Sequence, residues 1–109
     1  MRARKDFKYA RRPTPPGEIL LEEFMKPLNL TQTELAKLMK VPRRRVNEIV
    51  GGRREVTPDT GHRLAAVFRT SAEFWVNLQL RFDLWRVYQV KRQEYQAIKP
   101  ITKESKNFA

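Results

Sequence analysis

A helix start signal at residue 31 and a helix stop signal at residue 51 restrict the fold of this chain more than any other feature. "TQTE" at residues 31–34 is a capping box, in which the Thr31 hydroxyl accepts a hydrogen bond from the third helical amide and Glu34 reaches back to the Thr31 amide. An apolar stripe follows, at Leu35, Ala36, Leu38 and Met39. This spacing predicts a short helix over residues 31–39 with one buried face.

A second helix pattern begins near Pro42, directly after the connection Lys40–Val41, and ends at the glycine pair 51–52. Its apolar positions share one helical face, and its polar positions lie mostly on the other face. The apolar positions are Val46, Ile49 and Val50; the polar ones are Arg43, Arg44, Asn47 and Glu48, with Arg45 on the flank. Two helices joined by so short a turn form the helix-turn-helix pattern.

The remaining sequence predicts three more helices and no strand, so the fold class is all-α with five helices. One helix covers residues 16–25, a fourth begins at Thr57–Pro58, and the fifth runs from residue 70 or 71 to about 96. We expect three regions: a basic flexible tail over 1–14, a helix-turn-helix domain with a dimerising C-terminal helix over 15–96, and a disordered tail over 97–109.

The charge of the chain favours a polyanionic partner, with nucleic acid first and an anionic membrane surface second. Its formal net charge is +11, and residues 40–54 hold six basic side chains and one acidic one. There is no cysteine, and no apolar stretch approaches the ~20 residues of a membrane span. We therefore expect a soluble, cytoplasmic protein without a membrane partner.

The three arginines at residues 43–45 stand where a helix N-terminus disfavours cations, by roughly 0.3–1 kcal/mol each. The alternative is that these arginines simply form a solvated helix face. Three consecutive arginines at an unfavourable position indicate instead that they have a function. In a helix-turn-helix the first residues of the second helix meet base edges in the major groove, and the arginine fork matches guanine O6 and N7. The predicted DNA-binding residues are Gln32, Arg43, Arg44, Arg45, Asn47, Glu48, Arg53 and Arg54.

Three of these residues have particular expected roles. Arg53 and Arg54 follow the second helix and are placed to clamp the DNA backbone. Glu48 has two possible roles. It accepts a hydrogen bond from a cytosine amino group, or it forms an ion pair with a neighbouring arginine along the helix, and we favour the ion pair.

The long C-terminal helix carries aromatic residues beyond the part that the compact domain needs. Phe82, Trp85 and Tyr88 are the predicted dimer interface, because a large apolar surface projecting past a core indicates an interface. The alternative is that this segment folds back onto the first helix.

Several stretches resemble the HigA family of antitoxins, also described as virulence-associated protein I, within the phage-repressor-like helix-turn-helix class. They are "PGEILLEEF", "RRRVNEIV", "TSAEFWVNLQ" and "DLW", and they occur in this order over about residues 15–86. The resemblance implies a dimeric antitoxin of a type II toxin–antitoxin module. Such a protein binds its operator DNA, represses its own operon, and neutralises a HigB-type toxin that cleaves messenger RNA.

Two positions depart from the family pattern. Lys40 stands where family members usually have the glycine of the turn, and a left-handed conformation strains lysine. Pro42 stands where serine or threonine often caps the second helix. Both departures concern the geometry of the turn.

No catalytic residues, metal ligands or cofactor site are predicted, so we do not expect an enzyme. His62 is the only histidine and has no cysteine or acid at ligand spacing. Two other functions stay open. One is a stand-alone helix-turn-helix transcriptional repressor without a toxin, and the other is an RNA-binding or interaction module that uses the basic tails.

Overall fold

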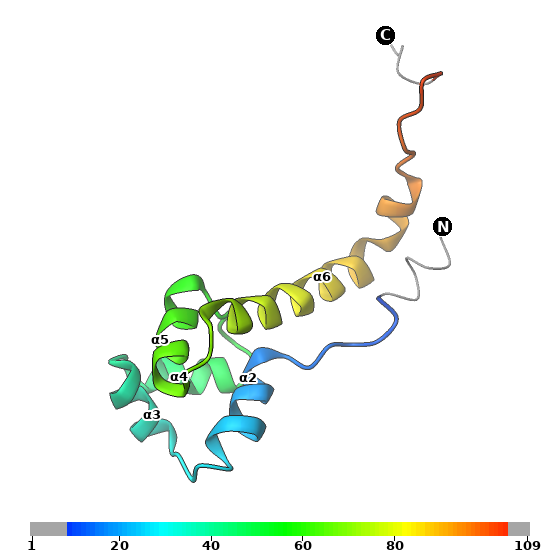
Figure 1. Ribbon diagram of the computed structural model, residues 1–109. Helices are drawn as coiled ribbons and strands as arrows, with labels where there is room; N and C mark the ends of the chain where they lie inside the picture. The colour runs from blue at the N-terminus through cyan, green and yellow to red at the C-terminus, as the bar shows by residue number, and fades with distance from the viewer. Residues whose placement is uncertain (1–8, 105–109) are drawn as a thin grey trace.

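The computed structural model describes residues 9–104, which form five helical rods and no strand (Figure 1). The helices are α2 (Pro16–Ile19) continuing into the π-helix η1 (Leu20–Met25), α3 (Gln32–Met39), α4 (Arg43–Val50), α5 (Pro58–Phe68) and α6 (Ala72–Ala97). The prediction of an all-α fold with a long C-terminal helix is confirmed. Residues 1–8 and 105–109 of the two predicted tails lie outside the described residues. Among the helices that the structure describes, none has the length and apolar character needed to cross a membrane.

The first predicted helix has the expected bounds, but its second half is not an α-helix. From Leu20 onward the turns widen to the π form, and the amide of Lys26 donates to the carbonyl of Leu21, five residues back (3.0 Å). Leu20 and Met25 are also five residues apart, and both are buried. The wider turn therefore places both side chains on the face that meets the core.

The capping box at the start of α3 is confirmed in both directions. The amide of Glu34 donates to Thr31 Oγ1 at 3.1 Å, and the amide of Thr31 donates to Glu34 Oε1 at 2.9 Å. The bond from the Thr31 amide stabilises the ionised carboxylate and is the largest cause of the lowered pKa of Glu34, whose ordinary value is 4.5. The sequence thus fixes where the first helix of the pair begins.

The turn between α3 and α4 has the strain that Lys40 predicts. Lys40 is left-handed, with φ 59° and ψ 47°. Arg63 of α5 stabilises this turn, because its Nη1 donates a hydrogen bond to the carbonyl of Met39 at 2.9 Å. Pro42 precedes α4 in an extended conformation and supplies no side-chain cap, as predicted.

The core lies where α2, η1, α3, α4 and α5 meet the first turns of α6. Val46 and Ile49 of α4 are 0% and 1% exposed, so the apolar face predicted for this helix is buried. The prediction that Leu38 belongs to the buried stripe of α3 is wrong, because its side chain is 58% exposed. Leu38 lies almost opposite Ala36 around the helix, and the buried line of α3 runs through Leu35, Ala36 and Met39.

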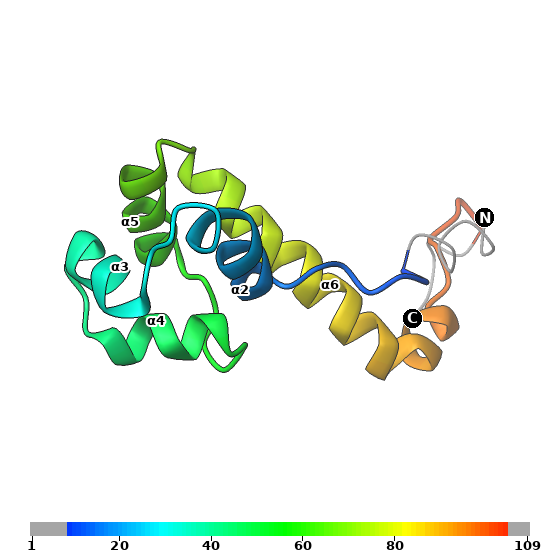
Figure 2. The same cartoon turned by 90° about the horizontal axis from the view of Figure 1, so that it is seen from below.

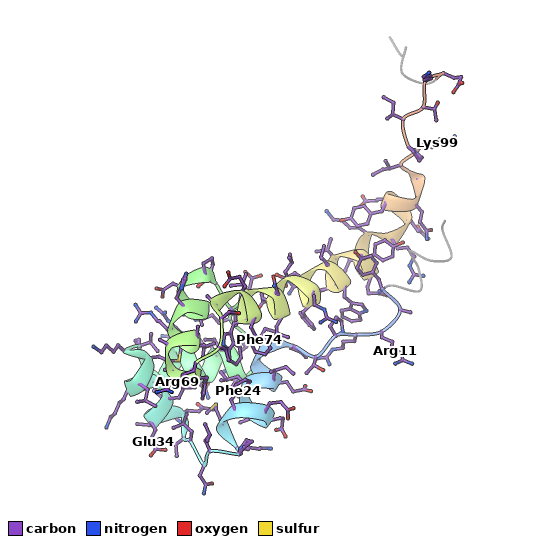
Figure 3. The ribbon with its side chains drawn as sticks, viewed as in Figure 1. Arg11, Phe24, Glu34, Arg69, Phe74 and Lys99 are labelled. Carbon is purple, nitrogen blue, oxygen red and sulfur yellow. The ribbon has the colours of Figure 1, made fainter. Side chains whose placement is uncertain are left out.

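An aromatic cluster anchors the start of α6 (Figure 3). The Phe24 ring lies 5.0 Å from Phe68, 6.1 Å from Phe74 and 4.9 Å from Trp75, measured between centroids. Trp75 is fully buried, and its Nε1 donates to Thr70 Oγ1 at 2.8 Å. This cluster joins η1, α5 and α6 on the side of the core away from α4.

Helix α2 approaches the end of α4 so closely that only glycine fits at the contact. A β-carbon at Gly17 would lie 2.0 Å from the carbonyl oxygen of Ile49. Backbone atoms cannot move aside as the end of a flexible side chain can. Gly17 therefore sets the position of α4 relative to α2.

Helix α6 extends well past the packed helices, and the N-terminal segment runs back beside it (Figures 1 and 2). The Tyr9 ring lies 4.7 Å from the Tyr88 ring, and Gln89 Nε2 donates to the Tyr9 carbonyl at 2.7 Å. The helix bends at Lys91, where φ is −113° and ψ is 20°. The far half of α6 therefore packs on the N-terminal segment and does not fold back onto α2.

Candidate nucleic-acid interface

The N-terminal end of α4 presents two arginines to solvent. The apolar face of α4 is fixed in the core, so residues on its other face must point outward. The Arg44 side chain is 85% exposed, and its Nε donates to Glu48 Oε2 at 3.3 Å. Arg43 is exposed and makes no ion pair with any residue that the structure describes. Arg43 therefore carries a guanidinium group without an ion-pair partner among the described residues, and the guanidinium group of Arg44 stays largely exposed although it bonds Glu48.

Arg45 is already engaged within the protein. Its Nη1 donates to Asp59 Oδ2 at 3.1 Å, and its side chain is 28% exposed. The same carboxylate oxygen accepts from Nε of Arg63 at 2.9 Å. These two bonds lower the pKa of Asp59, with Arg63 the larger cause and Arg45 the second. Arg45 therefore ties α4 to the start of α5, and its predicted contact with DNA stays a prediction.

Asp59 and Arg63 are site residues that the sequence analysis did not include, although their i,i+4 spacing on α5 indicates an ion pair. Arg63 bonds both this carboxylate and the carbonyl of Met39 at the turn. One arginine therefore links the left-handed turn, α5 and, through Asp59, helix α4.

The amides of Gln32 and Asn47 form a polar bridge between the two helices of the motif. Asn47 Nδ2 donates to Gln32 Oε1 at 3.0 Å, and Asn47 Oδ1 accepts from Arg53 Nη2 at 2.7 Å. Gln32 and Asn47 are half-buried, whereas Arg53 is exposed. The structure thus brings three predicted site residues from α3, α4 and the following loop into one hydrogen-bonded row.

Glu48 joins two of the predicted arginines. It accepts from Arg54 Nε at 2.9 Å through Oε1 and from Arg44 through Oε2. The bond from Arg54 is the largest cause of the lowered pKa of Glu48, so the carboxylate stays ionised. This geometry agrees with pairing along the helix as the favoured role of Glu48 over a contact with cytosine, and Arg54 is a partner that the sequence did not indicate.

All eight predicted DNA-binding residues lie on or beside α4. The three predicted dimer residues lie on α6 and are at least partly covered. Phe82 and Trp85, near the middle of α6, are half-buried, and Tyr88, in its second half, is 8% exposed. Among the residues that the structure describes, no group of histidine and acidic side chains is arranged to hold a metal ion.

Comparison with known proteins gives a consistent assignment. The family described as "Helix-turn-helix" matches residues 21–75. An uncharacterised helix-turn-helix transcriptional regulator of Escherichia coli K12, YbaQ, is 47% identical over 77 residues, which are 71% of this chain and 68% of that protein. Antitoxin HigA-1 of Vibrio cholerae is 35% identical over 94 residues, which are 86% of this chain and 89% of that protein.

A solved structure extends the likeness to three dimensions. Pseudomonas aeruginosa antitoxin HigA, determined with the higBA promoter, superimposes with a TM-score of 0.80 at 38% identity. The alignment covers 84% of this chain and all of that one. The compact helices, the turn and much of α6 are therefore shared with that protein.

Because of the ion pairs of Asp59, we expect the stability of the folded protein to fall at acid pH. Its pKa is lowered in the folded protein from an ordinary value of 3.8, so the stabilisation is present above that value. The stabilisation is lost as pH falls through the lower folded pKa. We expect Asp59→Asn to unfold at lower urea concentration than the wild type near neutral pH, and the difference to shrink as pH is lowered toward 3.

Glu55→Asn is the matched control, because it also removes one exposed carboxylate, whose only ion pair with a described residue is a 3.8 Å contact with Arg86. Urea titrations of the three proteins over a pH series give the midpoints. A difference between Asp59→Asn and wild type that stays constant with pH would rule out this electrostatic account.

Proposed function

Because this chain belongs to the HigA family of helix-turn-helix antitoxins, we propose that it binds the operator of its own operon as a homodimer and neutralises a HigB-type toxin. The toxin expected from the family cleaves messenger RNA. One observation carries the DNA part of the proposal: Arg43 and Arg44 project from the start of a helix whose opposite face is locked in the core.

The polar groups around α4 divide into two roles. Arg43 and Arg44 stand at the end of the helix that meets base edges in this motif, so we assign base recognition to them. Arg53 and Arg54 lie beyond the other end and suit phosphate contacts, which fix the protein on the duplex without reading sequence. Arg45, held by Asp59, positions the helix.

Helix α6 carries an exposed apolar stripe that a second copy of the chain could bind. Leu80, Leu84 and Val87 are 52%, 47% and 41% exposed, and their i, i+4, i+7 spacing places them on one face. Tyr88 of the predicted interface is covered by Tyr9. We therefore propose this stripe as the centre of the dimer contact, with the predicted residues Phe82 and Trp85 at its margin.

A transcriptional repressor without a toxin is the second candidate. The observation that favours it is the 47% identity to a protein named as a transcriptional regulator. A toxin partner predicts that a small basic protein encoded next to this gene co-purifies with the chain and loses its ribonuclease activity when bound. If no neighbouring product binds while operator binding is intact, the repressor is the correct function.

Base recognition predicts different results for two arginines. Arg44→Ala should weaken operator binding by about 1–3 kcal/mol and relax base preference at one position. Arg54→Ala should weaken operator and unrelated duplexes by similar factors, because a phosphate contact carries no sequence information. Gel-shift titrations of both variants against operator and base-substituted operator measure these effects. Wild-type affinity and preference in both variants would refute the groove model.

Dimerisation through the stripe predicts that charge placed in it separates the two copies. Leu84→Glu should sediment as a monomer at concentrations where the wild type is a dimer, because two carboxylates would be buried at the contact. Leu38→Glu is the control, since Leu38 is 58% exposed on α3, away from α6. Analytical ultracentrifugation gives the masses, and a dimer that survives Leu84→Glu would move the interface elsewhere.

A further inference from the structure

Glu48 lies between the arginine assigned to base recognition and an arginine assigned to phosphate contacts. Arg44 precedes it by four residues, so the two side chains lie one turn apart on the same face of α4. Arg54 follows in the loop after the helix, and Figure 2 shows this loop at the edge of the packed helices. One carboxylate therefore meets guanidinium groups from both sides.

The two arginines bond this carboxylate in different ways. Nε and Nη2 of Arg54 each lie 2.9 Å from Glu48 Oε1, so most of the guanidinium fork of Arg54 is engaged. Arg44 donates to Oε2 through Nε at 3.3 Å, and its two terminal nitrogens bond no residue that the structure describes. Glu48 thus holds Arg44 by one nitrogen and leaves available the terminal donors that can match O6 and N7 of guanine.

Holding an arginine in this way has two physical consequences. An unrestrained arginine samples many rotamers, and it can turn to a phosphate, which every sequence offers, instead of to a base. A carboxylate on Nε restricts these rotamers before DNA binds, so less entropy is lost when the base is contacted. The carboxylate also offsets one of the two positive charges, because the bond from Arg54 lowers the pKa of Glu48 and keeps it ionised at neutral pH.

We propose that Glu48 is a positioning residue that determines the sequence specificity of α4 through Arg44. It orients the terminal nitrogens of Arg44 for a guanine edge, and it keeps this arginine from the phosphates of unrelated sequences. The inference rests on the proposed operator binding by α4, and it requires no contact between Glu48 and a base.

Two substitutions separate the charge of Glu48 from its reach. Glu48→Gln keeps the length of the side chain and removes its charge, whereas Glu48→Asp keeps the charge and is one methylene shorter. Glu22→Gln is the matched control, because Glu22 also forms an i,i+4 ion pair, with Lys26 at 2.6 Å, but on η1. Fluorescence anisotropy over a salt series measures the affinity of each full chain for operator, base-substituted operators and a random duplex.

We expect both Glu48 variants to lower the ratio of operator to random-duplex affinity several-fold, and to relax base preference at the base pair where Arg44→Ala relaxes it. Glu48→Gln should also steepen the slope of log affinity against log salt by about one on the random duplex, because one more arginine charge can neutralise a phosphate. Glu48→Asp and Glu22→Gln should keep the wild-type slope. Glu48→Gln added to Arg44→Ala should lower the ratio no further, since Glu48 acts through Arg44.

Three outcomes would overturn the proposal. The first is a wild-type ratio and base preference in both Glu48 variants, and the second is a loss that adds in full to that of Arg44→Ala. The third is relaxed preference at a different base pair, which would show that Glu48 itself contacts a base. Equal binding of operator and random duplex by the wild type is a separate result, because it would refute operator recognition by α4 and this inference with it.

Discussion

The burial of one face of α4 is the constraint on which the rest of the site depends. Val46 and Ile49 are almost completely removed from solvent, and Gly17 lets α2 approach the end of the same helix. A helix fixed on one side has its opposite side fixed as well, because side-chain directions follow the helical period. The outward direction of Arg43 and Arg44 is thus a consequence of apolar packing, and no polar contact is needed to produce it.

Polar contacts then decide which groups around α4 remain available. Asp59 holds Arg45, Glu48 holds Arg54 and Arg44, and Asn47 holds Arg53. These bonds are exposed, so each adds little to stability, but together they restrict the rotamers of long side chains. A site whose side chains are ordered before binding loses less entropy when DNA arrives. Arg43 is the exception, and it carries the unpaired charge at the tip of the helix.

Basic side chains lie in two separate regions, around α4 and on the N-terminal segment, and the length of α6 keeps these regions apart. The principal dimensions are 59 × 25 × 22 Å, and the far half of α6 is packed by the N-terminal segment. That segment covers Tyr88 and leaves Leu80, Leu84 and Val87 exposed. One helix therefore carries an exposed stripe for a second copy beside the surface that the N-terminal segment covers.

The sequence by itself determined the elements whose signals are local. The capping box at Thr31 and the apolar face of α4 are each set by residues within one or two helical turns, whereas the left-handed turn at Lys40 was expected from the family resemblance. Contacts between distant residues could not be predicted from the sequence. They are the ion pair of Arg45 with Asp59, the hydrogen bond by which Arg63 supports the turn, and the packing of Tyr9 on Tyr88. The π-helical turn of η1 and the exposure of Leu38 belong to this second group as well. Local patterns specify a helix and its faces, whereas only the packed fold decides which partner each side chain meets, because that choice depends on residues far along the chain.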